Sequence, residues 1–265
     1  MAKGKRASGK WPLAFKQVGL NNDTNLLKLI AMVTMLIDHT GKMLFHSNIM
    51  RIIGRTAFPI YAYCIAVGCV YSKNHLKYLS RIVLMGLISQ PFYAVAMGHA
   101  SKAMYAVHFA DNPVGAVVNF YVQSWYHPGI FLTLALGLMF IWTIRERQLV
   151  LTAALALLVW RIQGSIDYGW RGIALIGLFY LFCSKWWLSL PVVFTFMFWW
   201  GLGSTSYQLF GIRFGIQMFA LMALPFIYIP TQSKLKINKW VFYLFYPAHL
   251  ICMLLIEMAM GMVLV

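Results

Sequence analysis

The sequence places ionisable side chains inside long apolar runs. Asp38, His39 and Lys42 lie in the run LLKLIAMVTMLIDHTGKMLF, and Arg55 lies near the start of the next run, RIIGRTAFPIYAY. A charge at the centre of a bilayer costs about 2.5 kcal/mol or more, so such residues face protein or water and are usually functional. These four residues are therefore the first candidates for chemistry.

The spacing within the first run predicts one polar helix face. Lys42 follows Asp38 by four residues and His39 by three, and His46 follows Lys42 by four. At about 100° per residue, side chains with this spacing share one broad side of an α-helix. A helix surrounded by lipid does not carry such a face, so we expect it to point into a bundle.

Arg55 is the expected ion-pair partner of Asp38. Both residues are predicted to lie toward the outer side of adjacent membrane spans, and Gly54 and Pro59 predict a kink beside Arg55. The alternative is a pair that only joins two helices. We favour a functional pair, because a buried ion pair is weak evidence for stability.

Two further groups lie in or beside later apolar runs. His249 falls near the middle of KWVFYLFYPAHLICMLLIEM, and the loop IDYGWRG places Asp167, Tyr168 and Arg171 at the outer mouth of another run. The structural alternatives are an interhelical hydrogen bond for His249 and a polar turn for the loop. If all these groups converge, they form a site in the outer half of the bundle.

Acid–base chemistry is the chemistry that this set of side chains fits. Imidazole has an unperturbed pKa of about 6.5, so His39 or His249 suits proton transfer near neutral pH. Arg55 stays charged and suits an oxyanion, a carboxylate or a phosphate. The sequence contains no G-x-S-x-G, H-E-x-x-H or Walker motif, which removes support for a serine hydrolase, a zincin or an ATPase.

The composition predicts an all-α, polytopic transmembrane bundle. Of the 265 residues, 61% are hydrophobic, compared with about 45–50% in a soluble domain. The formal charge of +16 is typical of basic loops on the cytoplasmic side of a membrane protein, so nucleic acid is not an expected partner. The four cysteines show no metal-binding spacing, and we expect no metal.

Nine apolar segments are long enough, or nearly so, to cross a bilayer, which takes roughly 17–25 residues. The segment from 98 to 128 is the longest loop, and its part 114–125 has the pattern of a re-entrant or interfacial helix. The nine predicted spans are 26–46, 52–71, 79–97, 129–144, 148–163, 170–184, 186–201, 211–229 and 240–262.

The distribution of Lys and Arg predicts the orientation. The N-terminal arm and alternate connections hold fifteen of these residues, and the opposite connections hold five. Because the basic side is cytoplasmic, the N-terminus is predicted inside and, after nine spans, the C-terminus outside. We expect a basic cytoplasmic arm (1–25) followed by one transmembrane domain (26–265).

Several stretches together resemble the TraX family, inner-membrane proteins linked to N-acetylation of conjugative pilin. The stretches are LKLIAMVTMLIDHTGK, RIIGRTAFPIYAY, ISQPF, LTLALGL, DYGWRGIALI and FYLFYPAHLICML, in the order of the family and spread from Lys28 to Leu254. The arm and the loop 98–128 carry no resemblance.

The resemblance implies a multi-pass inner-membrane acetyltransferase that uses acetyl-CoA as a substrate and a pilin N-terminus as the acceptor. It implies catalytic roles for Asp38, His39, Arg55 and His249, and the same matching motifs hold the expected substrate-binding residues, Asp167, Tyr168 and Lys42. Three alternatives remain open. In the first, the acceptor is a glycan or a lipid of the cell envelope instead of pilin. In the second, the protein is a transporter of a charged solute. In the third, it is a scaffold whose buried charges only hold helices together.

Overall fold

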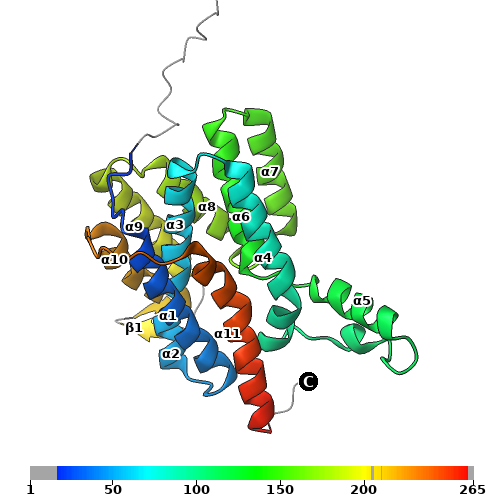
Figure 1. The fold of residues 1–265 in the computed structure, drawn as a ribbon. Helices are drawn as coiled ribbons and strands as arrows, with labels where there is room; N and C mark the ends of the chain where they lie inside the picture. The colour runs from blue at the N-terminus through cyan, green and yellow to red at the C-terminus, as the bar shows by residue number, and fades with distance from the viewer. Residues whose placement is uncertain (1–16, 204–205, 210, 262–265) are drawn as a thin grey trace, which may run out of the picture.

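The computed structural model is an elongated bundle of helices, most of which run roughly parallel or antiparallel to one another (Figure 1). It describes residues 17–203, 206–209 and 211–261, so most of the predicted N-terminal arm lies outside the described part. The helices in chain order are α1 (Thr24–Met43), α2 (Asn48–Gly54), α3 (Ala57–Tyr71), α4 (His75–Ala96), the 3-10 helix η1 (Lys102–Tyr105), α5 (Pro113–Ser124), α6 (Ile130–Arg145), α7 (Leu149–Ile162), α8 (Gly169–Leu181), α9 (Trp186–Leu202), the 3-10 helix η2 (Ile216–Ala223), α10 (Leu224–Tyr228) and α11 (Lys239–Ala259).

Three helical segments are long and apolar enough to cross a membrane. They are Asn48–Tyr71, which contains both α2 and α3, together with α4 and α11. Shorter apolar helices occupy five of the six remaining predicted spans: α6, α7, α8, α9 and the segment Ile216–Tyr228. The first predicted span, 26–46, is occupied by α1, which is not among these apolar segments. The all-α class is therefore confirmed, the three long apolar segments agree with a multi-pass membrane protein, and the count of nine crossings stays a prediction.

Helix α3 lies at the centre of the bundle. It packs against α1, α6 and α8, and most of its side chains are buried. Its residues Phe58 and Tyr63 belong to the main hydrophobic core, which also contains Phe179 and Tyr180 of α8. This packing fixes the position of the N-terminal end of α3, and therefore also that of Arg55 just before it.

The second predicted span is broken where α2 meets α3. Helix α2 ends at Gly54 and α3 begins at Ala57. Pro59 has no backbone N–H and cannot donate to the carbonyl of Arg55 four residues earlier, which explains the interruption. The kink predicted beside Arg55 is thus present as a two-residue break.

The first predicted span is shorter than expected at its end. Helix α1 ends at Met43, and a connection whose His46 has a φ of 47° leads into α2. Ser47 caps α2 by accepting a hydrogen bond from the Met50 N–H. The prediction that His46 shares the polar face of α1 is therefore wrong, because the chain has already turned and the side chain is exposed.

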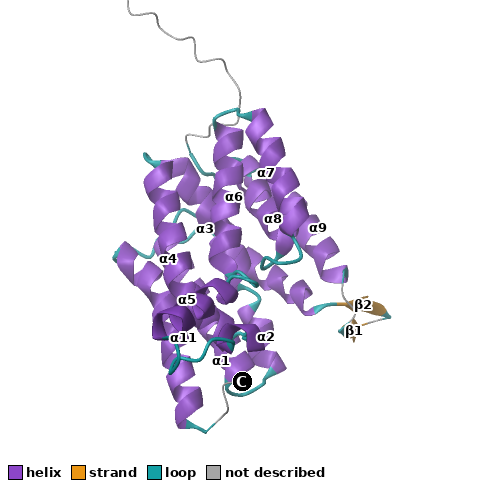
Figure 2. Ribbon diagram, turned by 90° about the vertical axis from the view of Figure 1, so that its right-hand side faces the viewer, coloured by secondary structure: helices purple, strands orange, loops and turns teal. Residues whose placement is uncertain are grey.

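The eighth predicted span, 211–229, is wrong as a regular helix. Its start forms the strand β2 (Ile212–Phe214), which pairs antiparallel with β1 (Tyr207–Leu209). Only afterwards does the chain become helical, in η2 and α10. Figure 2 shows the hairpin standing out from the helices. The segment is apolar as predicted, but Gly211, with a φ of 81°, permits the tight turn of the hairpin.

Helix α5 confirms that the middle of the long loop is helical. Asn112 caps it by accepting from the Gly115 N–H, and it projects sideways from the lower end of α4 (Figure 1). Val114, Val117 and Val118 are exposed on it. Whether α5 enters a membrane stays a prediction.

Candidate functional site

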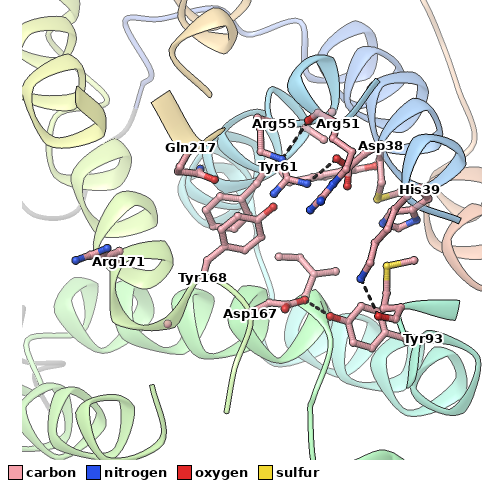
Figure 3. Close-up of a pocket in the computed structure, with 18 of the residues that line it drawn as sticks. Asp38, His39, Arg51, Arg55, Tyr61, Tyr93, Asp167, Tyr168, Arg171 and Gln217 are labelled. Carbon is pink, nitrogen blue, oxygen red and sulfur yellow. Dashed lines mark hydrogen bonds and ion pairs between the residues drawn. The ribbon is translucent and has the colours of Figure 1, made fainter. Parts of the chain in front are cut away.

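A cavity of about 600 Å³ opens among α1, α2, α3, α4, α8 and η2 (Figure 3). It brings together residues that are far apart in the chain. Six of the seven predicted site residues line it: Asp38, His39, Lys42, Arg55, Asp167 and Tyr168. The seventh, His249, lies behind His39 on α11.

Asp38 and Arg55 form the predicted ion pair. An Nη of Arg55 lies 2.5 Å from Oδ1 of Asp38, and the Arg55 Nε–H donates to the Arg51 carbonyl at 3.2 Å. Gly54 allows the close approach, since a Cβ there would meet the Asp38 side chain. The break between α2 and α3 therefore places the guanidinium directly against α1.

His39 and His249 are joined by a hydrogen bond that fixes the protons on both rings. Nδ1 of His249 lies 2.9 Å from the Phe245 carbonyl, which can only accept, so this nitrogen carries a proton. In the neutral ring, Nε2 of His249 then accepts from Nδ1 of His39 at 2.8 Å. The Nε2 of His39 is left with a free lone pair, as a general base requires.

The two histidines differ in their position relative to the cavity. His39 lines the cavity, and both side chains are buried, at 8% and 5% exposure for His39 and His249. The His249 ring stacks on the Phe245 ring and packs against the Tyr246 ring in a T-shaped arrangement, and these contacts hold it in place. His39 therefore borders the cavity, whereas His249 lies behind it and contacts its ring through the shared hydrogen bond.

Lys42 reaches across the cavity from α1 to α4. Its ammonium donates to the Met97 carbonyl at 2.7 Å, at the end of α4. The Lys42 ammonium therefore lies near His99, and it attracts the Asp167 carboxylate electrostatically. Lys42 contributes a positive charge to the same wall as His39.

Asp167 is held on the opposite wall of the cavity by two hydrogen bonds. The Tyr93 hydroxyl donates to its carboxylate at 2.7 Å, and the Thr133 hydroxyl donates to its backbone carbonyl at 2.5 Å. Burial raises the pKa of the Asp167 carboxyl, against the opposing effects of the Tyr93 hydrogen bond and of nearby Lys42. The cavity therefore contains a second carboxyl group in a different environment from Asp38.

Tyr168 forms an aromatic wall in the middle of the cavity. Its backbone has a φ of 62° just before α8, a conformation uncommon for a side chain of this size. The ring stacks on Phe58 at 3.8 Å between centroids and meets Trp200 edge-on, and burial raises the pKa of its hydroxyl to about 12. The strained residue is kept in place by these contacts, which is common at functional sites.

Sequence reasoning missed several residues of the site. Tyr93 follows directly after the ISQPF stretch, so its position beside a recognisable motif was an available signal. Arg51 is predicted only as a basic residue outside the spans, and Gln217 lies in the segment predicted as a membrane helix. Arg171 is predicted at the outer mouth of a span together with Asp167 and Tyr168, but not as a site residue. All four line the cavity.

The described residues contain no group of three or more His, Cys, Asp or Glu side chains arranged to hold a metal ion. The cavity instead combines four cations, Lys42, Arg51, Arg55 and Arg171, with two carboxyl groups. Such a site suits an organic substrate that bears negative charge, or a reaction in which negative charge develops.

Most of the chain matches one known protein family. The TraX protein family matches residues 23–257, which is most of the sequence and contains every residue of the cavity. The chain belongs to the TraX protein family.

A curated relative covers a smaller part of this TraX protein. The probable fimbrial assembly protein FimC, serogroup H1, of Dichelobacter nodosus is 32% identical over 119 residues. That match covers 43% of the chain and 43% of the relative, so the chain spans less than half the length of this protein. No solved structure matches the chain significantly.

Proposed function

We propose that this TraX protein is a membrane-embedded acetyltransferase that moves an acetyl group from acetyl-CoA to an acceptor amine. The observation that carries the proposal is His39, which lines a cationic cavity with a free Nε2 lone pair and lies one residue from the Asp38–Arg55 pair. Membership of the TraX family supports the same reaction class.

The proposed reaction is the attack of the amine nitrogen on the thioester carbonyl. A nitrogen–carbon bond forms, the carbon–sulfur bond breaks, and a proton leaves the nitrogen. His39 accepts this proton through Nε2 and returns it to the departing thiolate, while His249 keeps the other side of the ring protonated and oriented. Arg55 stabilises the oxyanion of the tetrahedral intermediate, and Asp38 holds Arg55 in position.

Asp167, Tyr168 and Lys42 have supporting roles in this proposal. The Asp167 carboxylate and the Tyr168 ring form the wall opposite His39 and bind the acceptor beside the base. Lys42 adds positive charge where negative charge develops. None of the three is needed to take the proton.

The preferred acceptor is the N-terminus of a pilin subunit. The relative named as a probable fimbrial assembly protein supports a pilus-related role, and a glycan or lipid amine of the cell envelope is the alternative acceptor. The site is predicted to lie in the outer half of an inner-membrane protein, whereas acetyl-CoA is made in the cytosol. The protein would therefore transfer the acetyl group across the bilayer.

The test is a transfer assay with the full chain in detergent. Labelled acetyl-CoA is incubated with a pilin-derived peptide that has a free N-terminus, and mass spectrometry locates the label. The same peptide with a blocked N-terminus is the matched control. The proposal expects label on the free amine alone. If neither peptide nor any envelope amine is labelled, and acetyl-CoA does not raise the melting temperature by mass action, the proposal is wrong.

A further inference from the structure

Acetyl transfer to a peptide amine leaves one proton that has to be removed from the cavity. The α-amino group of a peptide has an unperturbed pKa of about 7.7–8.0, so at neutral pH it arrives mostly as an ammonium. In the proposed reaction, His39 takes a proton from the attacking amine and returns it to the thiolate. The additional proton of the ammonium is released once in each turnover, and it needs a route out of the cavity.

The pair of His39 and His249 does not provide this route. Nε2 of His249 is bound to His39, and Nδ1 of His249 donates to the Phe245 carbonyl, which is not basic near neutral pH. Both rings are buried. The Asp38 carboxylate is occupied by its ion pair with Arg55. The ammonium proton therefore has to leave through another group.

A second pair of histidines lies on the Asp167 side of the cavity. The rings of His99 and His127 are 4.8 Å apart between centroids, and the His99 ring is 5.7 Å from the Tyr93 ring. The Tyr93 hydroxyl donates to the Asp167 carboxylate, and His127 attracts that carboxylate electrostatically. These four residues therefore form one cluster of titratable side chains beside the cavity.

Backbone hydrogen bonds fix the positions of both histidines. Gly98, with a φ of 71°, turns the chain just after α4, and the His99 N–H donates to a carbonyl of the last turn of α4 at 2.8 Å. The Gln90 amide of α4 donates to the His127 carbonyl at 3.0 Å and accepts from the Gly129 N–H at 3.0 Å. Both rings are thus held against the same helix, α4.

The histidine pair connects the cavity with the surface of the protein. His99 lines the cavity, and the His127 ring packs in a T-shaped arrangement against the ring of Tyr126, which is 76% exposed. Burial, together with the charges of Lys42 and His127, lowers the pKa of His99, so this ring readily gives up a proton that it receives. The charged and titratable groups around the pair are Lys42 from α1, Tyr93 from α4, Asp167 before α8 and Tyr126 beside His127.

We propose that His99 and His127 carry the ammonium proton of the acceptor out of the cavity. The ammonium binds the Asp167 carboxylate, and one of its protons passes through this carboxylate to a ring nitrogen of the pair, directly or through one water. The acceptor nitrogen keeps the electron pair of the broken N–H bond and becomes the neutral amine that attacks the thioester. His127 then releases the proton to water.

This proton differs from the one that His39 takes during the attack. The inference rests on the proposed acetyl transfer, and it adds a separate step that only a protonated acceptor requires. An acceptor whose nitrogen is already neutral has no proton to release before the attack. The two histidines are therefore expected to matter for one kind of acceptor and not for the other.

The experiment compares two acceptors that differ in the basicity of the reacting nitrogen. One is a peptide with a free α-amino group, and the other is the same peptide with an aminooxyacetyl N-terminus, whose nitrogen is unprotonated at neutral pH. His99→Gln/His127→Gln should lower transfer to the α-amino peptide at pH 7 by roughly tenfold or more, since a proton-transfer group is lost. Transfer to the aminooxy peptide should stay near the wild-type rate.

The pH dependence of transfer to the α-amino peptide gives a second readout. Above about pH 9 most α-amino groups are already neutral in solution, so the rate of the double variant should approach that of the wild type. Added imidazole can carry the proton in place of the missing rings and should restore part of the loss at pH 7. A pair of residues that only supported the fold would produce neither effect.

The matched control is His108→Gln. His108 is exposed in the same connection between α4 and α6 and does not line the cavity, so its replacement should leave both acceptors at wild-type rates. The ratio of the two rates in one preparation does not depend on the folded fraction. The comparison therefore remains decisive even if the double variant melts early.

An unchanged ratio of the two rates in His99→Gln/His127→Gln would overturn the proton route and leave the proposed acetyl transfer standing. A loss confined to the α-amino peptide, relieved at high pH, would support the route. If the wild type transfers acetyl to neither acceptor, the proposed function is wrong, and the proton route is overturned with it.

Discussion

Two buried polar clusters in this protein are built in opposite ways. The first is centred on Asn21, which is 1% exposed and lies before α1. Its side-chain nitrogen donates to the carbonyls of Phe226 and Ile229 and to the Thr231 hydroxyl, and its oxygen accepts from the Asp23 N–H. The second is the cavity around Asp38, His39 and Arg55.

The two clusters differ in how many of their polar atoms have a hydrogen-bond partner. At Asn21 every polar atom of the side chain has a partner, and the Tyr63 hydroxyl donates to the backbone carbonyl as well. Around the cavity, by contrast, Nε2 of His39 has a free lone pair, and three buried donors of lining residues have no partner among the described residues: Nε of Arg51, Nε of Arg171 and Nε2 of Gln217. The fully hydrogen-bonded cluster at Asn21 joins the N-terminal segment to the end of α10. The cavity leaves donors and acceptors unpaired, and a bound substrate can pair with them.

Replacing His39 tests the reactive side of the comparison and has the largest expected effect. His39→Ala removes the base and should lower acetyl transfer by about 10²–10⁴-fold, the usual contribution of acid–base catalysis. Transfer is measured with labelled acetyl-CoA at saturating acceptor. The control is His46→Ala, an exposed histidine seven residues later that lies outside the cavity. Equal activity in the two variants would contradict the role of His39.

Replacing Asn21 tests the structural side. Asn21→Ala strands the carbonyls of Phe226 and Ile229 and the Thr231 hydroxyl, which should cost about 2–3 kcal/mol of stability. Chemical denaturation in detergent measures the loss, and transfer per folded molecule should stay near the wild-type value. A folded Asn21→Ala protein with transfer reduced as far as in His39→Ala would break the distinction between the clusters.

A smaller effect is expected where the backbone supports the ion pair. A Cβ on Gly54 would meet the Asp38 side chain, so Gly54→Ala should push Asp38 off Arg55 and cost about 1–3 kcal/mol. Transfer should fall with it. The control is Gly177→Ala, whose Cβ would meet the Phe140 ring at an ordinary 3.4 Å. If Gly54→Ala melts and reacts as Gly177→Ala does, the close approach has no role in the site.

The smallest expected effect concerns the second carboxyl group of the cavity. Because burial raises the pKa of Asp167, the ionised carboxylate destabilises the folded state at high pH, and protonation relieves this as the pH falls through the raised pKa toward 3.8. Asp167→Asn keeps an acceptor for Tyr93 without the charge. It should therefore melt higher than the wild type at pH 8, with the gap closing as the pH falls.

Thermal unfolding between pH 4 and pH 8 checks this prediction. Asp111→Asn, which changes an exposed carboxylate outside the cavity, is the control and should not show a gap that closes at low pH. A gap for Asp167→Asn that stays constant over the whole range would mean that the charge at Asp167 is not the cause.

The chemistry of the site was more predictable from the sequence than its shape. Charges in apolar runs are rare enough that Asp38, His39 and Arg55 could be selected from composition and spacing alone, and the ion pair followed from their similar depth. The pairing of His39 with His249 could not be predicted, since it depends on how α1 packs against α11, two helices about two hundred residues apart in the chain.

The errors have physical causes as well. An apolar segment such as 211–229 satisfies a hydropathy criterion whether it forms an α-helix, a hairpin or a 3-10 helix. Gln217 was missed for this reason, because a glutamine in a supposed span carries no charge to draw attention. His46 was misplaced because α1 ends three residues earlier, a boundary that helical periodicity alone does not define.

The most direct test of the central claim, that the charges of the cavity serve chemistry, is the double variant Asp38→Asn/Arg55→Gln. Removing both charges together avoids a stranded buried ion, which would cost about 3–5 kcal/mol and confuse folding with function. Transfer from labelled acetyl-CoA and the melting temperature are measured on the same preparation. We predict a protein that folds and melts near the wild type but transfers no acetyl group. A double variant that folds and retains wild-type transfer would show that the pair only joins two helices.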